Sequence, residues 1–179
     1  MSLTMNAVAF PILADGIPIV YQGQEQHFSG GKVPYNREAL WTSGYNTSSV
    51  LYQYISTLNS IRSWAISYNS NYLGYNAWPI YSDTQTIAMR KGFAGNQVVA
   101  VYTNAGSSGA TYSLSFPSSN TGFSNSQSVI ELLTCTTYTT NSTGYLNFAM
   151  TNGLPMVFYP ASAQTGSGIC STTSGKQLI

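Results

Sequence analysis

Two segments in the N-terminal part of the chain carry apolar side chains at helical spacing. Residues 3–14 are apolar on nearly every side, which is typical of a helix buried between a sheet and other helices. In residues 48–68 the apolar positions recur every three or four residues along one stripe, after a candidate N-cap at Ser48 or Ser49. We therefore predict two helices, the second lying with one face on another layer.

A short strand is predicted between these helices. Residues 17–21 form a continuous apolar run rich in β-branched side chains, the pattern of a strand buried on both faces in a parallel sheet. Gly16 ends the helix before it. Such a strand needs parallel neighbours, and the rest of the chain does not supply them.

From Tyr72 onward the pattern changes to short runs of period two that are separated by turn residues. About seven strands in this length favour an antiparallel sandwich with Greek-key connections. The clearest runs are Thr86 to Met89, Gln97 to Tyr102, Tyr112 to Phe116, Val129 to Leu133, Tyr145 to Phe148 and Pro155 to Tyr159.

The two patterns divide the chain into residues 1–71 and residues 72–179. The first part has the form of the last helix, strand and helix of an α/β barrel, and it cannot be stable alone because its strand edges and apolar faces are uncovered. The second part is interpreted as a complete small β domain that can be stable alone.

Charge is scarce, since only 6% of the residues are charged, with 6 Lys and Arg against 5 Asp and Glu. No cationic cluster is present that would neutralise phosphates or anionic lipid, so nucleic acid and membranes are not expected as partners. Solubility that rests on hydroxyl and amide groups indicates an extracellular protein. The apolar run from Ala7 to Ala14 is too short to span a bilayer and has no basic segment before it, so it is neither an anchor nor a signal peptide, and a signal peptide is expected upstream of this chain.

Cys135 and Cys170 are the two cysteines, and no His or third Cys lies near them in the sequence to complete a metal site. An extracellular setting favours a disulfide between them, with two buried free thiols as the alternative. Asn46 and Asn141 each begin a glycosylation sequon, a weak signal in a chain so rich in Asn, Ser and Thr.

The chain has five carboxylates that could serve in acid–base chemistry. Asp15 is expected at a helix end or turn, Asp83 in a turn and Glu131 on a strand, the last two exposed to solvent. Glu25 and Glu38 share the loop after the 17–21 strand and are the only local candidates for a catalytic pair. Nothing in the sequence argues for the desolvated and charged pair that catalysis by two carboxyl groups requires.

Four segments resemble fungal secreted α-amylases of glycoside hydrolase family 13, and the similarity runs from about residue 3 to Cys170. The resemblance implies a (β/α)8 barrel followed by an antiparallel Greek-key domain. Residues 3–14, 17–21 and 48–68 then correspond to the seventh helix, eighth strand and eighth helix, and the cysteine spacing is similar to that of the family's last disulfide. The four segments read GIPIVYQGQEQHFSGG, NREALW, IRSWAIS and WPIYSDTQTIAMRKG.

The resemblance also implies an activity, the hydrolysis of α-1,4-glucan bonds with retention by an Asp nucleophile and a Glu acid/base, helped by a third carboxylate. In the family these residues and the ligands of a structural calcium all precede the helix at which this chain begins. We therefore predict that this chain alone is inactive and binds no cofactor, and that the complete enzyme is a secreted, calcium-containing monomer that acts on starch and maltooligosaccharides.

Arg37 is the best candidate for substrate binding, because it resembles the family's Arg that hydrogen-bonds glucose, and a guanidinium suits vicinal hydroxyls. The alternative is an ordinary ion pair with Glu38. Tyr35 and Trp41 flank this loop as candidate stacking residues, although aromatic residues more often serve in packing. Val33 departs from the family, which usually has an Asp there that also binds the sugar, so we expect this subsite to be weaker or differently shaped.

Gln24, Glu25 and His27 follow the predicted strand and are expected to support the site rather than to react. The resemblance implies that Glu25 is a hydrogen-bond partner beneath the site, and a lone His is interpreted as a loop hydrogen-bonder. Three further aromatic residues are expected in or beside the sandwich core: Trp78, Tyr81 and Tyr112.

Two other functions are compatible with the sequence. One is a starch-binding β module with a leftover helical extension, for which residues 72–179 would be retained on insoluble starch. The other is a truncated product without a biochemical role, which predicts exposed apolar surface and aggregation of the intact chain.

Overall fold

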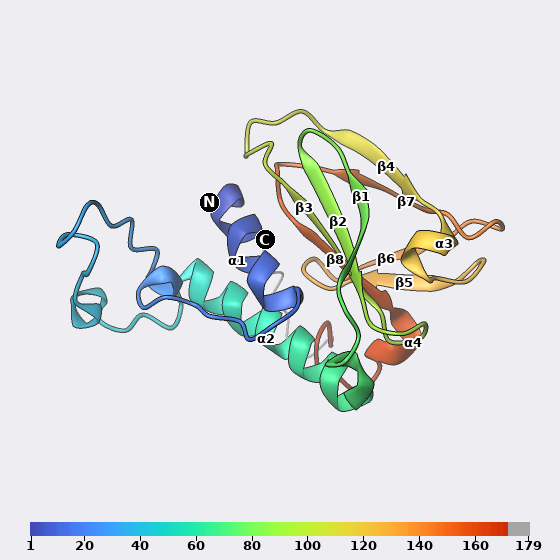
Figure 1. Ribbon diagram of the computed structural model, residues 1–179, viewed down its shortest axis with the longest axis horizontal. Coiled ribbons are helices and arrows are strands. Elements are labelled where there is room, and N and C mark those ends of the chain that lie inside the picture. The colour runs from blue at the N-terminus through green and yellow to red at the C-terminus, as the bar shows by residue number, and fades with distance from the viewer. Residues whose placement is uncertain (172–179) are drawn as a thin grey trace.

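The computed structural model describes residues 1–171 and consists of a two-layered β sandwich with two long helices on one side (Figure 1). The helices and single turns of helix are α1 (Ser2–Leu13), η1 (Gln24–Gln26), η2 (Leu40–Ser43), α2 (Val50–Tyr68), η3 (Ser70–Tyr72), α3 (Ser118–Thr121) and α4 (Ala161–Gln164). The strands are β1 (Trp78–Ser82), β2 (Thr86–Lys91), β3 (Val98–Thr103), β4 (Tyr112–Phe116), β5 (Ser128–Glu131), β6 (Thr136–Thr139), β7 (Leu146–Met150) and β8 (Met156–Pro160).

The strands form two antiparallel sheets, one of six strands in the order β1-β2-β3-β8-β5-β6 and one of two strands, β4-β7. The pairings are nested, because the β5–β6 hairpin lies within the β4–β7 pair, which lies within the β3–β8 pair. The chain therefore crosses between the sheets four times. The antiparallel β domain predicted from the sequence is confirmed.

An aromatic and aliphatic core fills the space between the two sheets. The ring centroid of Phe148, in the small sheet, lies 5.3 Å from that of Phe116 in the same sheet and 4.8 Å from that of Phe158 in the large sheet. The other buried members from the large sheet are Ala88, Val99, Val101 and Val129, and those from the small sheet are Leu114, Leu146 and Met150.

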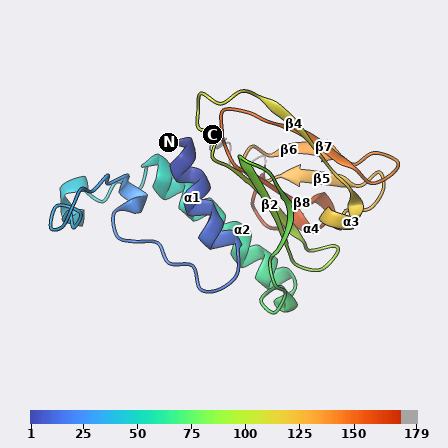
Figure 2. The ribbon, with the colours of Figure 1, turned by 45° about the horizontal axis from the view of Figure 1, so that its top comes forward.

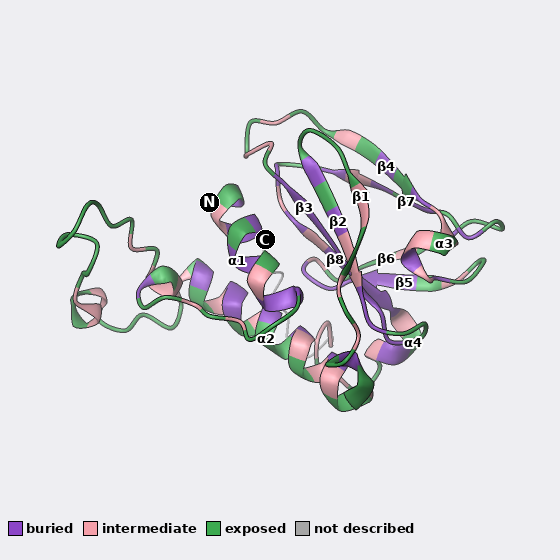
Figure 3. Cartoon of the chain, viewed as in Figure 1, coloured by how far each residue is buried: buried purple, intermediate pink, exposed green. Residues whose placement is uncertain are grey.

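A second core lies on the outer face of the six-stranded sheet, beneath α1 and α2. All six residues of β3 are buried, so this strand is covered on both faces (Figure 3). The sheet contributes Val98, Ala100, Tyr102, Ile130, Val157 and Tyr159. The helices contribute Met5, Val8, Ala9, Ile12, Leu13, Leu51, Tyr54, Ile55, Leu58, Ile61 and Ala65. The two parts divided at residue 71 thus share one core, and the division itself stays a prediction.

Both predicted helices are present, with α1 at residues 2–13 and α2 at residues 50–68. The buried Asn6 side chain ties α1 to the sheet, since its Nδ2 donates to the Gly153 carbonyl at 2.8 Å and its Oδ1 accepts from the Thr103 N–H at 2.7 Å. Ser49 occupies the N-cap position of α2 but makes no capping bond, because its hydroxyl donates to the Glu25 carbonyl at 2.7 Å. None of the helices in residues 1–171 combines the length and apolar character needed to cross a bilayer.

The predicted strand at residues 17–21 is absent, which corrects the sequence-based expectation. The segment pairs with no strand of residues 1–171, and Ile17 and Ile19 are 89% and 80% exposed. A parallel strand forms only when neighbouring strands satisfy its N–H and C=O groups, and no strand in residues 1–171 does so for this segment.

All six runs proposed as strands are present, and two strands were not foreseen. These are β1 and β6, which form the two edges of the six-stranded sheet. An edge strand is partly exposed on both faces, so it lacks a clear apolar period, and β1 also contains Pro79, which has no N–H for a ladder.

The disulfide between Cys135 and Cys170 is confirmed, with the two Cα atoms 5.3 Å apart. The expectation that Glu131 is solvated is wrong, because the residue is fully buried beside this disulfide loop. The period-two pattern placed Glu131 correctly on a strand, but its carboxylate accepts hydrogen bonds from the N–H groups of Leu133, Thr134 and Val157 rather than from water.

Candidate functional site

The loop that follows residues 17–21 forms an open pocket of about 460 Å³, which we call the Arg37 hollow. Gln22 and Gln24 line one side of it, and Asn36, Arg37 and Glu38 line the other. In Figure 1 this loop and the turns after it extend away from the helices and the sandwich. The hollow therefore belongs to the part of the molecule with the least support from the described chain.

One wall of the hollow depends on the glycine at position 23, which has a φ of 92°. A Cβ at Gly23 would lie 2.4 Å from the Phe28 ring, so no other residue fits without movement of that ring. The Gly23 N–H donates to Glu25 Oε2 at 3.0 Å, and the Tyr21 N–H donates to Gln24 Oε1 at 2.7 Å. Gln24 and Glu25 thus fold the backbone beneath the hollow, the position expected for supporting residues.

The opposite wall is a turn that begins at the cis bond before Pro34, and the Arg37 N–H donates to the Pro34 carbonyl at 3.1 Å. Glu38 closes this wall against the first one, because its Oε1 accepts from the Gly30 N–H at 3.3 Å and its carbonyl accepts from Gln22 Nε2 at 3.4 Å. Within residues 1–171 the Arg37 guanidinium forms neither an ion pair nor a hydrogen bond, so the alternative of a pair with Glu38 does not occur there.

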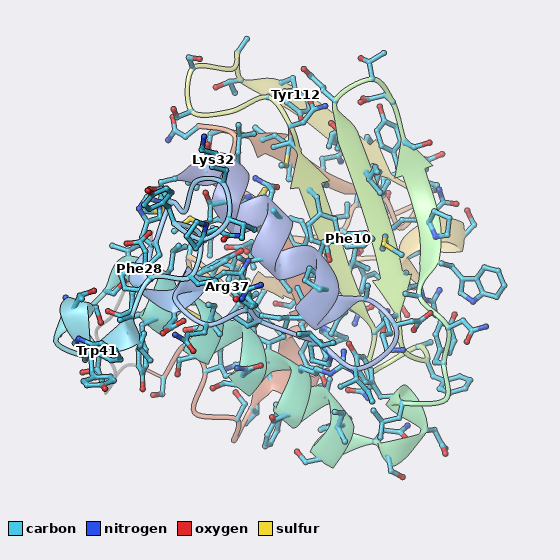
Figure 4. All side chains as sticks on the ribbon, turned by 60° about the vertical axis from the view of Figure 1, so that its left-hand side comes forward. Phe10, Phe28, Lys32, Arg37, Trp41 and Tyr112 are labelled. Atoms are coloured by element: carbon cyan, nitrogen blue, oxygen red, sulfur yellow. A yellow bond between two sulfur atoms is a disulfide. The ribbon has the colours of Figure 1, made fainter. Side chains whose placement is uncertain are left out.

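The two aromatic candidates do not line the hollow. Tyr35 and Trp41 are each 71% exposed, and Trp41 lies on η2, well apart from Arg37 (Figure 4). Val33 is also exposed outside the hollow, at 64%. The structure therefore brings together Arg37 and Gln24 but not the aromatic pair.

His27 ends the η1 turn with a φ of 62°, and its N–H donates to the Gln24 carbonyl at 3.1 Å. Its side chain is exposed and has no hydrogen-bond partner among the described residues. The turn is held to the start of α2 by the Ser49 bond and by Gln26 Nε2, which donates to the Asn46 carbonyl at 3.2 Å. His27 therefore contributes to the turn through its backbone N–H and not through its side chain.

Two of the carboxylates serve structural bonds far from the hollow. Asp15 pairs with Lys91 at 2.6 Å, and although burial raises the pKa of Asp15, its bonds to Lys91 and to the Ala77 N–H and the charge of Arg62 together hold it below its ordinary value. Asp83 caps a turn, and hydrogen bonds, first that from the Gln85 N–H, lower its pKa. Both are ionised anchors rather than proton donors.

Glu131 is the third structural carboxylate, and burial raises its pKa despite four hydrogen-bond donors that favour the charged form. No two of the five carboxylates share a pocket with the geometry of an acid and a nucleophile. Within residues 1–171 there is also no group of three His, Cys, Asp or Glu side chains that could hold a metal ion.

A second surface, missed by the sequence analysis, lies on the β domain. Trp78 is 57% exposed on the edge strand β1, so it lies beside the sandwich core rather than in it, and it stands opposite Arg90 across the β1–β2 pair. The Arg90 guanidinium lies 5.9 Å from the Tyr75 ring, which contacts Phe93 at 4.8 Å between ring centroids. Tyr81 and Tyr112 do pack against the core as expected. The available sequence signal was Pro79, which marks an edge strand.

Comparisons with known proteins agree with this architecture. Residues 79–178 match the protein-family profile described as alpha-amylase, domain C. The chain is 45% identical over 170 residues to alpha-amylase 1 of Schwanniomyces occidentalis, covering 95% of this chain and 33% of that protein. It is 57% identical over 170 residues to alpha-amylase 1 of Lipomyces kononenkoae, covering 95% of this chain and 27% of that protein.

Among solved structures, an alpha-amylase from Malbranchea cinnamomea superposes with a TM-score of 0.89 at 43% identity, over 96% of this chain and 35% of that one. The chain therefore spans about a third of the length of this structure and of the Schwanniomyces relative. The superposition covers 96% of this chain and so extends beyond residues 79–178, which match the family profile.

Proposed function

This chain belongs to the α-amylase family through its domain C, and on that premise we propose that it is the C-terminal part of a longer, secreted α-amylase. In that enzyme residues 1–71 supply the seventh helix, eighth strand and eighth helix of a (β/α)8 barrel, and residues 72–179 form the β domain. The observation that carries this proposal is the extended, apolar segment 17–21, whose exposed Ile17 and Ile19 need a sheet on both sides.

The reaction we propose is endo-hydrolysis of α-1,4 bonds in starch and related glucans with retention of configuration. Such a reaction needs a carboxylate nucleophile and a carboxylic acid about 5 Å apart. The carboxylates of residues 1–171 are engaged in turns, in an ion pair or in the core, which supports the proposal that the reacting groups come from outside this chain. The same holds for the calcium ligands, because the described residues do not fit such a site.

Within that enzyme the Arg37 hollow forms part of the sugar-binding cleft. The Arg37 guanidinium has no protein partner in the described chain, so its donors are free to bind vicinal hydroxyls of a glucose unit. Val33 cannot accept a hydroxyl hydrogen bond, so Arg37 acts at this subsite without the carboxylate that relatives have there.

Secretion and glycosylation are part of the same proposal. A disulfide persists in oxidising compartments, and both sequon asparagines are exposed. The Asn46 side chain accepts from the Ser48 N–H at 2.9 Å, and that of Asn141 accepts from the Thr143 N–H at 2.9 Å, so each lies in an accessible turn.

The test begins with the intact mass of the native secreted protein that contains the peptide GIPIVYQGQEQHF. We expect a deglycosylated mass well above 19.3 kDa, hydrolysis of starch that first releases the α-anomer, and no hydrolysis by purified residues 1–179. A native mass near 19.3 kDa would contradict the proposal. So would turnover by the short chain that disappears in Glu25→Gln or Glu38→Gln.

A second candidate function, glucan binding without catalysis, is favoured by the surface around Trp78. Exposed aromatic rings stack on the apolar faces of sugars, and Arg90 stands beside Trp78 and Tyr75 with its guanidinium near the surface. Retention of residues 1–179 on insoluble starch, lost in Trp78→Ala and kept in Trp41→Ala, would support it. Equal retention of both variants would locate binding elsewhere, and no retention of the unmodified chain would reject this function.

A further inference from the structure

Three parts of the fold meet where the chain leaves α1. The Lys91 side chain of β2 is 4% exposed and its Nζ donates to Asp15 Oδ1 at 2.6 Å and to the Tyr75 carbonyl at 2.5 Å. The other oxygen of Asp15 accepts from the Ala77 N–H at 2.8 Å. The Nζ also lies 5.2 Å from the centre of the Tyr72 ring. The buried ammonium group of Lys91, in the β domain, thus holds Asp15, the residue that follows the C-cap of α1.

A second cation reaches the same point from α2. Arg62 donates through Nη1 to the carbonyls of Ile12 and Ala14, at 2.8 and 3.1 Å, and through Nη2 to the carbonyl of Gly16 at 2.8 Å. The carbonyls of Ile12 and Ala14 are ones that the end of a helix leaves without intrahelical partners, and Gly16 lies just beyond that end. Asp15, Arg62 and Lys91 together are called the exit hub below.

Within residues 1–171 the segment after the exit hub pairs with no strand, so its position depends on its two ends and on Val20, which packs against the core beneath the helices. The far end is held at the start of α2, where the Ser49 hydroxyl donates to the Glu25 carbonyl. Ser49 and Arg62 are about 20 Å apart along α2, at a rise of about 1.5 Å per residue. Figures 1 and 2 show the segment leaving the end of α1 and running back toward the N-terminal end of α2.

We propose that Lys91 and Arg62 are positioning residues for the Arg37 hollow. By fixing Asp15 and Gly16 they set the register at which residues 17–21 enter the hollow, so that Gly23 meets Phe28 and Gln24 faces Arg37. A slip of one residue would turn every side chain of the segment to its other face. The role in sugar binding rests on the proposed function, whereas the positioning itself is a property of this chain.

Hydrogen exchange measured by mass spectrometry on residues 1–179 tests the positioning. Lys91→Met keeps the length of the side chain and removes its charge, Asp15→Asn keeps the shape of the acceptor, and Lys32→Met is the control on an exposed lysine outside the hollow. Both hub variants are expected to speed exchange of the Ala77 amide by about tenfold, the effect of losing a charged hydrogen bond. They should also speed exchange of the bonded amides of Gly23, Phe28 and Gly30.

Lys32→Met should change none of these amides. Faster exchange at Ala77 with unchanged exchange at Gly23, Phe28 and Gly30 would overturn the proposal. The exit hub would then stabilise only its own contacts and not the hollow. If Lys91→Met fails to fold, Asp15→Asn decides, since Asp15 is 48% exposed and its replacement leaves no cavity.

Exchange rates measured over a range of pH distinguish the loss of the Asp15 charge from a general loss of stability. The charged and titratable groups that face Asp15 are Lys91 from β2, Arg62 from α2 and Tyr72 from η3. Its pKa is depressed, so the protection it gives is complete above the unfolded value near 3.8 and is lost as the pH falls through the folded value. The ratio of exchange rates between Asp15→Asn and the unmodified chain should therefore fall to one at low pH, and a ratio independent of pH would contradict the role of the charge.

Kinetic measurements on the longer enzyme distinguish a failure of this inference from a failure of the proposed function. There Lys91→Met should raise KM for maltooligosaccharides about tenfold, again the effect of one charged hydrogen bond, and leave kcat nearly unchanged. An equal loss in kcat, or no change in KM, would reject the link from hub to sugar. If the longer protein hydrolyses no glucan, the proposed function fails while the exchange experiment still decides the positioning.

Discussion

Glu131 Oε1 accepts a 2.8 Å hydrogen bond from the backbone N–H of Val157, so a buried carboxylate joins β5 to the start of β8. Its other oxygen accepts from the N–H and the hydroxyl of Thr134, at 2.7 and 2.6 Å. The loop held in this way carries Cys135. A single side chain thus organises the sheet edge and the disulfide together.

Replacement of this carboxylate is expected to destabilise the chain. Glu131→Gln offers one acceptor and places an NH2 group against backbone donors, which should cost about 1 to 3 kcal/mol of unfolding free energy. Burial raises the pKa of Glu131, so the stability that it contributes is complete below the unfolded value near 4.5 and declines as the pH rises through the folded value. Chemical denaturation of both proteins at pH 4 and pH 8 should show the larger difference at pH 4. An equal difference would contradict the raised pKa.

The Cys135–Cys170 disulfide closes a loop of 35 residues. Its removal in the Cys135→Ser and Cys170→Ser double variant should lower the unfolding free energy by about 3 to 4 kcal/mol in the chain-entropy model. Thermal unfolding of the double variant, compared with the unmodified chain with and without reductant, measures the effect. A reductant that changes the Tm of the double variant as much as that of the unmodified chain would show that the effect has another origin.

The β domain should not be soluble as residues 72–179 alone. In the full chain α1 and α2 cover Tyr102, Val157 and Tyr159 on the outer face of the large sheet, and without the helices this face becomes a continuous apolar patch. We expect the short form to bind a hydrophobic dye and to elute as aggregates, whereas residues 1–179 bind less dye. A monodisperse, folded short form would instead support the autonomous β domain that the sequence suggested.

The difference between the inner strands and the edge strands shows what apolar periodicity can and cannot predict. The runs at β3, β4 and β8 were foreseen because their side chains pack against other strands, and packing imposes the period. The edges β1 and β6 were not, since half of their surface meets water. The same rule explains Glu131, because a period of two shows which side chains share a face but not what covers that face.

Segment 17–21 and the Arg37 hollow show a different limit. Residues 17–21 were predicted to be a strand buried on both faces, but a strand requires partners, and within residues 1–171 no strand pairs with this segment. The hollow depends on backbone angles, such as the φ of 92° at Gly23, and on bonds between distant residues such as Gln22 and Glu38. The approximate location of Arg37 was predictable from the resemblance, but its closed loop was not.

Gly23 gives a local test of the hollow. Gly23→Ala places a Cβ 2.4 Å from the Phe28 ring at a positive φ, which should cost about 1 to 3 kcal/mol locally. Gly31→Ala is the matched control, because its Cβ would meet nothing within 4 Å and its φ is not positive. Amide NMR spectra should change around the hollow in the first variant only, with the β-domain signals unmoved. Equal spectra for both variants would mean that the hollow does not depend on this contact.

Arg37 provides the test closest to function, because its guanidinium lines the hollow and donates to no group within residues 1–171. In the longer enzyme Arg37→Ala should raise KM for maltotriose about tenfold, the effect of a lost charged hydrogen bond, and should change kcat on long starch much less. Long substrates contact many subsites, so the loss of one contact matters less to them. Arg37→Lys keeps the charge but not the planar pair of donors, so its KM for maltotriose should lie between those of the unmodified enzyme and Arg37→Ala. This variant separates bidentate hydrogen bonding from the attraction of the charge alone. Lys32→Ala, on the same loop, should have no effect, and unchanged kinetics in Arg37→Ala would remove Arg37 from the glucan site.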